Sequence, residues 1–203
     1  MTNQLFYQIV ETDEIMKTIQ VYNSDVYDTY PMVCFEIPNE NNNIIEEIIQ
    51  QLNDNGYGDN IYTFIQLPSR EKQKEFCLEQ LSPYFKNPKT CGIDIERDIC
   101  VYLTNEGNMC VAGKNFLPEV IKQYRNNYKS IPIHEVLRNY SFNQAEVFIP
   151  ESVNKLTTIQ WWNLQKIHDL ISKNKHEKIK IVCEKDLKLF TYDELVLNNI
   201  SEK

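Results

Sequence analysis

The stretch LFYQIVETDEIMKTIQVYNSDVYDTYPMVCFEI, residues 5–37, decides the fold of this chain. Three runs in it are rich in aromatic and β-branched residues, at positions 5–10, 15–22 and 32–37. Such runs, when separated by polar and turn-forming residues, are typical of β-strands. The stretch therefore predicts three strands near the N-terminus, with a loop over residues 23–31.

An amphipathic helix is expected next, over residues 44–52. Its apolar residues recur at helical spacing and predict one buried stripe: Ile44, Ile45, Ile48, Ile49 and Leu52. Asn43 and Glu46 have the spacing of a capping box at a helix start. Residues 61–67 then read as a strand, which makes residues 35–67 either a βαβ unit or a hairpin linked by a helix.

Two later helices are predicted from apolar spacing and cap residues. One begins after Ser69 and gives way to a loop at Pro83, and it buries four residues: Phe76, Cys77, Leu78 and Leu81. The other spans residues 159–173 and is capped by Thr157 or Thr158. Both helices present an apolar side that a core can cover.

The second half of the chain also contains predicted strands. Residues 93–104 alternate between apolar and polar side chains and predict one half-buried strand, which turns into residues 109–112 as a hairpin. Residues 178–183 and 187–191 are expected to pair as the last two strands. A helical turn over residues 192–197 follows them.

These elements, with one more helix that starts at Pro118, predict an α+β fold. We expect a mixed or antiparallel sheet with about four amphipathic helices in a single compact domain, residues 1–203. A chain of this length buries about 70% of its unfolded surface, enough for one good core. The alternative is two packed halves, an acidic one over residues 1–113 and a mildly basic one over residues 114–203.

The charge of the chain is unevenly distributed. The first 69 residues contain eleven acidic residues and one basic residue, Lys17, which is a net charge of −10. Because the whole chain carries −8, residues 70–203 carry +2. Such an asymmetry affects the choice of partners more than the fold. It predicts a basic protein partner and argues against direct binding of nucleic acid.

The composition gives little support to an enzyme. The three histidines are His134, His168 and His176, and the six cysteines include no close pair of the kind that zinc sites use. Nucleotide-binding loops and esterase-type motifs are missing, so no catalytic residue and no cofactor is assigned. The cysteines are expected to be reduced and mostly buried thiols.

The N-terminus lacks the features of a signal peptide, and no apolar run is long enough to span a membrane. We therefore expect a cytoplasmic protein of the producing or host cell, with no membrane contact. Asn, Ile, Lys and Tyr are abundant, a bias that proteins encoded by AT-rich genomes show. It points to a low-GC bacterium, its phage or a large virus as the source.

Candidate contact residues for a basic partner lie at four places. Acids interleave with tyrosines in one loop, and two glutamates lie on the polar side of the first helix. Three carboxylates share a face of the strand over 93–104, and one tryptophan lies on the polar side of a late helix. The predicted contact residues are Asp25, Tyr27, Asp28, Tyr30, Glu46, Glu47, Asp94, Glu96, Asp98 and Trp162.

Two of these places have alternative interpretations. Asp94, Glu96 and Asp98 could instead hold Mg²⁺, although a solvated strand face is the simplest interpretation. Trp162 could dock within its own chain, whereas the neighbouring Trp161 is expected in the core. His168 falls on the same side as Trp161 and is expected there too.

The leading hypothesis is a non-enzymatic intracellular binding protein. Its acidic N-terminal surface would engage a basic protein that handles nucleic acid, such as a nuclease, as an immunity-type inhibitor or a phage or viral antagonist does. One alternative is a Mg²⁺-dependent carboxylate enzyme acting on nucleotides or nucleic acid. Another is a structural or assembly subunit, because the lysines among residues 173–188 could pair with the acidic end of a second copy in a homo-oligomer.

Overall fold

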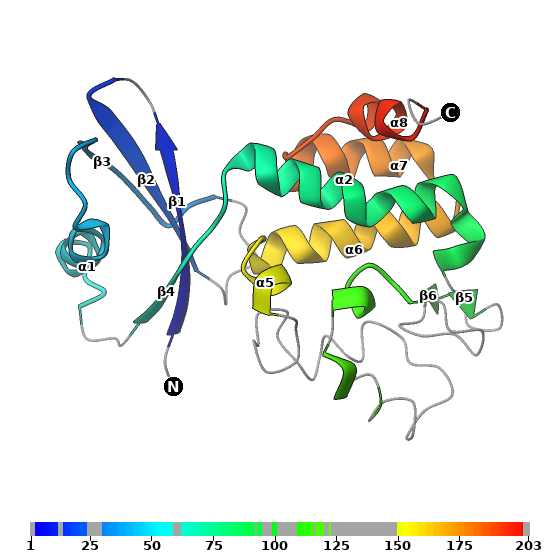
Figure 1. The fold of residues 1–203 in the computed structure, drawn as a ribbon, viewed down its shortest axis with the longest axis horizontal. Coiled ribbons are helices and arrows are strands. Elements are labelled where there is room, and N and C mark those ends of the chain that lie inside the picture. The colour runs from blue at the N-terminus through cyan, green and yellow to red at the C-terminus, as the bar shows by residue number, and fades with distance from the viewer. Residues whose placement is uncertain are drawn as a thin grey trace.

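The computed structural model describes residues 3–11, 14–23, 30–58, 62–91, 93, 94, 99, 100, 109–115, 117–119, 122 and 150–200. Within these residues the chain folds as one α+β domain, with a four-stranded mixed sheet and a group of helices (Figure 1). The predicted fold class is confirmed.

The three strands that residues 5–37 predict form an antiparallel meander. They are β1 (Asn3–Glu11), β2 (Met16–Asn23) and β3 (Val33–Pro38). Alternate residues of each strand face opposite sides of the sheet, and the side toward α1 (Ile44–Asp54) carries most of the apolar set, while Phe6 is buried on the other side. Burial of the side toward α1 fixes the register, because a slip by one residue would expose this set.

A fourth strand makes the sheet mixed. Helix α1 (Ile44–Asp54) carries the chain from β3 at one edge to β4 (Tyr62–Gln66) at the other, where β4 runs parallel to β1. The βαβ alternative is therefore correct. The side chains between α1 and the sheet form the sheet cluster: Leu5, Tyr7, Ile19, Val21, Ile37, Ile48 and Leu52.

The remaining described elements are mostly helical. They are α2 (Arg70–Lys86), the 3₁₀ turns η1 (Pro88–Cys91) and η2 (Gly113–Asn115), α5 (Pro150–Val153), α6 (Thr158–Ser172), α7 (His176–Ile181), the π-helix η3 (Val182–Leu187) and α8 (Tyr192–Ile200). Their buried side chains form a second core, the helical cluster, which includes Phe76, Leu81, Leu156, Trp161, Leu164 and Leu195.

Helix α6 starts and packs as predicted. The Thr157 hydroxyl accepts a hydrogen bond from the Gln160 N–H at 3.3 Å, and the Gln160 side chain accepts one from the Thr157 N–H at 2.8 Å. This is a complete capping box. Trp161 and His168 are fully buried in the helical cluster, which confirms the predicted inner side of the helix.

The two strands predicted over residues 178–183 and 187–191 are wrong. Residues of this stretch instead form α7 and η3. The β-branched residues favour a strand, yet Ile179, Val182 and Cys183 are spaced as on one side of a helix and all are buried. Burial of that side outweighs the strand propensity, which is context-dependent and spans only about 1 kcal/mol.

A single strand over residues 93–104 is also wrong. Residues of β5 (Ile93–Asp94) pair antiparallel with residues of β6 (Ile99–Cys100), so the chain reverses between them. Alternation of apolar and polar residues occurs on both arms of a hairpin and does not reveal the reversal. The strand predicted for residues 109–112 is replaced by an isolated bridge and a turn that lead into η2.

Two helix ends differ from expectation. Pro83 does not end α2, which continues to Lys86. Proline lacks an N–H and so removes one backbone hydrogen bond from the helix, whereas the next residue, Tyr84, is buried and favours its continuation. Asn43 makes no capping bond with its side chain. The side chain of Asn41 accepts the Asn43 N–H instead, at 2.9 Å.

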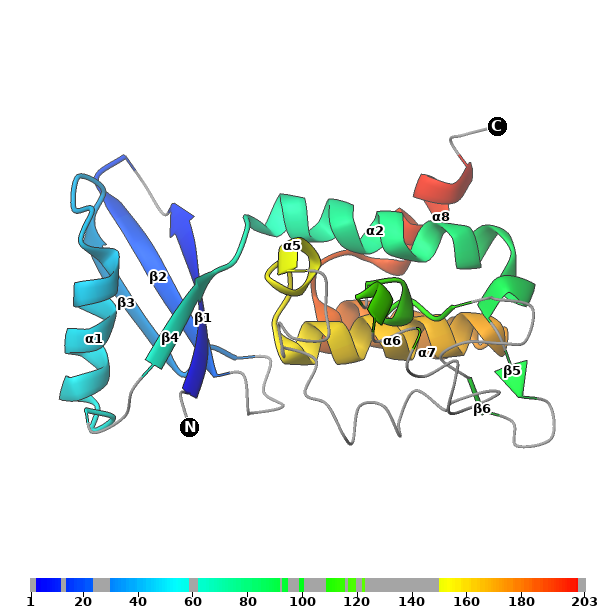
Figure 2. The same ribbon diagram turned by 60° about the horizontal axis from the view of Figure 1, so that its bottom comes forward.

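The sheet with α1 lies at one end of the molecule, and the helices around the helical cluster lie at the other (Figures 1 and 2). In the described residues, the chain passes from the sheet to the helices through the segment that joins β4 to α2. Gln8 fastens this segment to the sheet, since its amide donates to the Pro68 carbonyl at 2.9 Å. Division into halves at residue 113 stays a prediction.

Candidate functional site

Helix α1 presents the acidic residues predicted on it. Glu46 and Glu47 lie in its first turn, where the helix dipole favours negative charge. Glu46 is exposed, whereas Glu47 is half-buried and accepts a hydrogen bond from the Asn41 side chain at 3.0 Å. Glu40 before the helix and Asp54 at its end are exposed as well.

Lys17, the single base of the first 69 residues, points inward. Its side chain is only 8% exposed, and its ammonium group donates to the carbonyl oxygens of Asn39 at 3.0 Å and Asn41 at 2.6 Å. Lys17 therefore supports the loop before α1. Its donors are engaged inside the fold, while the acids around it remain at the surface.

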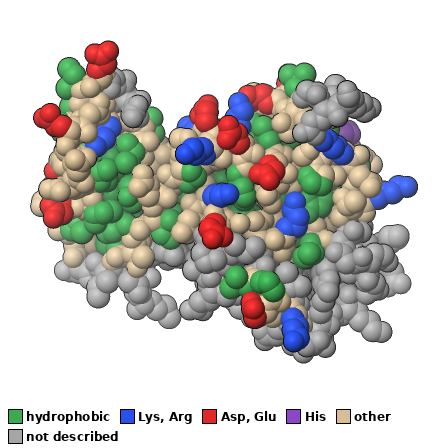
Figure 3. Space-filling view, viewed as in Figure 1, with side chains coloured by type: hydrophobic (Ala, Val, Ile, Leu, Met, Phe, Trp, Pro, Cys, Tyr) green, Lys and Arg blue, Asp and Glu red, His purple; other side chains and the backbone are tan. Residues whose placement is uncertain are grey.

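Two apolar side chains accompany these acids at the surface. Ile45 is 37% exposed and Ile49 is 42% exposed, and they lie one helical turn apart. The sequence pattern predicted both in the buried stripe, but only Ile48 and Leu52 are fully buried. The acidic α1 surface is defined here as Glu40, Glu46, Glu47 and Asp54 with Ile45 and Ile49. Figure 3 shows Asp and Glu along the outer edge of this part of the molecule.

The predicted contact loop is only partly described. Asp25, Tyr27 and Asp28 lie outside the described residues. Tyr30 is 66% exposed, and the Lys188 ammonium lies over its ring, 4.7 Å from the centroid. Tyr30 thus contacts the helical end of the molecule, a contact that no local residue pattern predicts.

The three carboxylates of the predicted strand face are not brought together by anything described. Asp94 belongs to β5, but its side chain, like Glu96 and Asp98, lies outside what the structure describes. The reversal between β5 and β6 removes the continuous strand on which their predicted spacing depended.

The side chain of Trp162 packs within its own chain. It is half-buried and packs against the helical cluster, next to the fully buried Trp161. Contact of its remaining surface with a partner stays a prediction.

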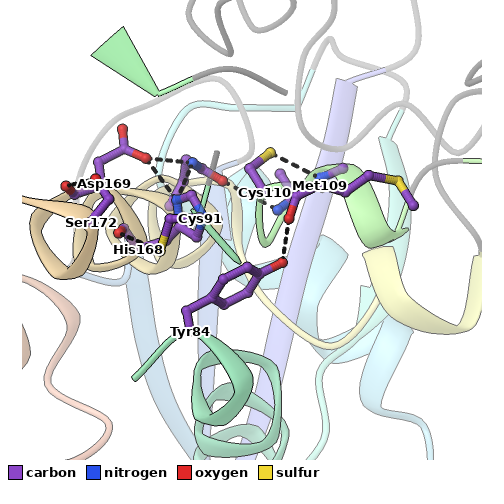
Figure 4. A network of polar contacts seen from close by, with 10 residues as sticks. Tyr84, Cys91, Met109, Cys110, His168, Asp169 and Ser172 are labelled. Atoms are coloured by element: carbon purple, nitrogen blue, oxygen red, sulfur yellow. Dashed lines mark hydrogen bonds and ion pairs between the residues drawn. The ribbon is translucent and has the colours of Figure 1, made fainter. Parts of the chain in front are cut away.

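A network of polar contacts inside the helical cluster is a second candidate site (Figure 4). His168 Nδ1 lies 2.9 Å from Asp169 Oδ1 and 3.1 Å from Gln165 Nε2, and the edge-on Tyr84 ring lies 4.5 Å away, centroid to centroid. His168 Nε2 is buried and makes no hydrogen bond with any described residue.

The contacts of this network favour a structural role over nucleophilic catalysis. The Cys91 thiol lies 3.8 Å from the main-chain oxygen of His168, a backbone atom that cannot activate a nucleophile as a base would. Tyr84 donates to the Met109 carbonyl at 2.5 Å, and burial raises the pKa of its hydroxyl well above the ordinary value. The first contact joins η1 to α6, and the second joins α2 to the segment before η2.

The described thiols are mostly buried, as expected. Cys34 is exposed, whereas Cys77, Cys91, Cys110 and Cys183 are buried. Burial raises the pKa of Cys183 to about 12, so this thiol stays protonated and unreactive.

Comparisons with protein-family models, with curated proteins and with solved structures found no match to this chain. In the described part of the chain, no helix has both the length and the apolar character needed to cross a bilayer. The same residues contain no group of three side chains suited to hold a metal ion. Function has to be inferred from the chain's own geometry.

Proposed function

We propose that this protein binds a basic protein through the acidic α1 surface and acts as an inhibitor or antagonist of a partner that handles nucleic acid. One observation carries the proposal. The Lys17 ammonium donates to the carbonyls of Asn39 and Asn41. The single base of the first 69 residues is therefore engaged inside the fold and does not compete with a cationic partner for the acids of the α1 surface.

The exposed isoleucines fit a binding role for the same surface. Protein interfaces combine an apolar centre with a polar rim, and Ile45 and Ile49 lie beside Glu46 in this manner. The acids would speed association with a cationic partner and make it depend on salt. The proposal keeps Asp25, Tyr27 and Asp28 of the predicted contact loop as further contact residues.

The test uses a charge reversal that spares the helix. Glu46→Lys puts an unfavourable charge at the start of α1, and Asp54→Lys puts a favourable one at its end, so the effects on the helix dipole oppose each other. Wild type and this double variant are immobilised and exposed to lysate of the producing or host cell. Wild type should retain basic, nucleic-acid-handling proteins that the variant does not, and salt should release them.

The matched control reverses two acids elsewhere. Glu75 on α2 and Glu151 on α5 are both exposed, so Glu75→Lys with Glu151→Lys changes the net charge equally. This control should retain the same proteins as wild type. Equal retention by the Glu46/Asp54 variant, with unchanged salt dependence, would contradict the proposal.

The magnesium-dependent enzyme has its own test. Calorimetric titration of wild type and Asp94→Ala with Mg²⁺ and Mn²⁺ should give no heat of binding if the protein is a binding protein only. Heat in wild type that disappears in Asp94→Ala would favour the enzyme.

A further inference from the structure

The end of the molecule opposite α1 carries lysines around aromatic rings. Phe85, His176 and Tyr192 form a trio whose ring centroids are 6.3 to 6.5 Å apart. The Tyr192 hydroxyl also lies 3.0 Å from His176 Nδ1. We define the lysine end as this trio with the lysines at the end of α2, in η1 and around the turn from α6 to α7: Lys86, Lys89, Lys173, Lys175 and Lys178.

The lysine end is net positive. Burial, and after it the carboxylates of Glu177 and Asp193, raise the pKa of the Tyr192 hydroxyl, so these two acids lie near the trio. The five lysines outnumber them. Phe85 and Tyr192 are half-buried and His176 is exposed, so the end offers aromatic edges as well as charge.

The acidic α1 surface and the lysine end lie at opposite ends of the molecule's long axis (Figures 1 and 2). Each offers what the other lacks: Ile45 and Ile49 among acids at one end, and an aromatic trio among lysines at the other. Because they are far apart on one chain, they can meet only between two copies.

We propose that a second copy of this chain binds to the acidic α1 surface through its lysine end. The inference rests on the proposed function, since it uses the same acidic surface, and it names a partner for that surface. Opposite charges would orient the two copies, and the isoleucines would pack against the aromatic trio.

Such a contact joins two different surfaces and is heterologous. Each added copy leaves one acidic end and one lysine end open, so the expected product is a head-to-tail chain unless the rotation closes a ring. A basic partner of the proposed kind would compete for the α1 surface and shorten these chains.

The first test is sedimentation velocity of the purified wild-type protein over a wide concentration range. At about 0.01 M salt the screening length is about 30 Å, and at about 0.15 M it is about 8 Å. At the lower salt the mean mass should rise with concentration well above that of the 24.1 kDa chain, and added salt should reverse the rise. A monomer under all these conditions would overturn the inference.

The second test changes the charge of each end separately. Glu46→Lys with Asp54→Lys takes the acidic α1 surface from a charge of −4 to 0 and leaves the lysine end unchanged. Lys175→Glu with Lys178→Glu leaves three lysines against four acids at the lysine end and keeps the acidic α1 surface unchanged. The two new glutamates fall at the start of α7, where the helix dipole favours them. Each variant alone should stay monomeric, and an equimolar mixture should associate again. A mixture that stays monomeric would refute the head-to-tail contact.

The two proposals fail in different ways. Lys175→Glu with Lys178→Glu should abolish self-association but still retain basic proteins on the unchanged α1 surface. The control Glu75→Lys with Glu151→Lys should associate as wild type does. A fluorescent oligonucleotide serves as a further probe: binding of it at the lysine end by a protein that remains monomeric would replace the second copy with nucleic acid.

Discussion

At the residue scale, Lys17 differs most between what its sequence context suggests and what the fold shows. By composition it is the one positive charge in an acidic region. In the fold it donates to the carbonyls of Asn39 and Asn41, and so it holds the loop between β3 and α1. A residue that counts as surface charge in the sequence therefore acts as an internal support.

Replacement of Lys17 by Met should lower the free energy of unfolding by about 1–3 kcal/mol, because two carbonyl oxygens lose their donor. Urea unfolding followed by circular dichroism measures this. Lys72→Met removes an exposed lysine of α2 and is the matched control, with an expected change within about 0.5 kcal/mol. A Lys17→Met protein as stable as this control would show that the two bonds are dispensable.

Sequence patterns assign single residues correctly where the core decides. Trp161 and His168 are buried as their helical spacing predicts, because other helices cover that side of α6. Ile45 and Ile49 have apolar side chains as well but stay exposed. Their spacing shows that they share a side of α1, and only the folded structure shows that this side is left uncovered.

At the element scale, α8 shows a start signal that the sequence analysis missed. Thr191 and Glu194 have capping-box spacing, and the Glu194 carboxylate accepts the Thr191 N–H at 2.7 Å while Thr191 Oγ1 accepts the Glu194 N–H at 3.2 Å. The same carboxylate binds the Lys74 ammonium of α2 at 2.5 Å. One glutamate thus starts α8 and docks it on α2.

This arrangement predicts a pH dependence. The Lys74 ammonium, and after it the Thr191 N–H, lower the pKa of the Glu194 carboxyl below its ordinary value of 4.5. A carboxyl whose folded-state pKa is depressed stabilises the fold above its unfolded-state pKa. That stability is lost as the pH falls from 4.5 through the lower folded-state value.

Glu194→Gln should therefore be less stable than wild type at neutral pH, and the difference should shrink as the pH falls through this window. Urea unfolding across the window measures the difference. Glu184→Gln, which changes an exposed carboxylate of η3, should leave the pH profile of wild type unchanged. A constant difference between Glu194→Gln and wild type would rule out the ionic contribution.

The incorrect strand prediction over residues 178–183 has a physical cause. These residues have strand-forming composition, but their conformation is decided by the apolar surface that they cover. Here the helical cluster buries Ile179, Val182 and Cys183 on one side of α7 and η3. A local preference of about 1 kcal/mol cannot oppose the burial of several such side chains, each worth about 1.5–3 kcal/mol.

At the scale of the whole molecule, Lys188 links the helical end to the loop before β3 at the sheet end. It follows η3 in a left-handed backbone conformation, φ 57°, which is uncommon for a residue other than glycine. Its carbonyl accepts the Arg70 guanidinium, and its ammonium covers the ring of Tyr30. The left-handed conformation aims this one residue at both α2 and the loop before β3.

A double-mutant cycle at Tyr30 and Lys188 should give a coupling free energy of about 0.5–1 kcal/mol, the range for an exposed cation–π pair. Lys188→Asn suits the cycle because Asn tolerates the left-handed conformation and keeps the main-chain carbonyl. Tyr30→Ser removes the ring. Unfolding free energies of wild type, both single variants and the double variant provide the measurement, and strictly additive effects would show that the pair does not couple.

The sequence by itself determined the α+β class, the three N-terminal strands, α1, α2 and α6, and the acidic character of the first 69 residues. These depend on local periodicity and composition, which neighbouring residues along the chain carry. Only the tertiary structure decided how the strands pair, that Lys17 turns inward, that Ile45 and Ile49 stay exposed, and that α1 and the turn from α6 to α7 lie at opposite ends of the molecule. Those outcomes depend on which surfaces meet after folding, and residues far apart in sequence settle them together.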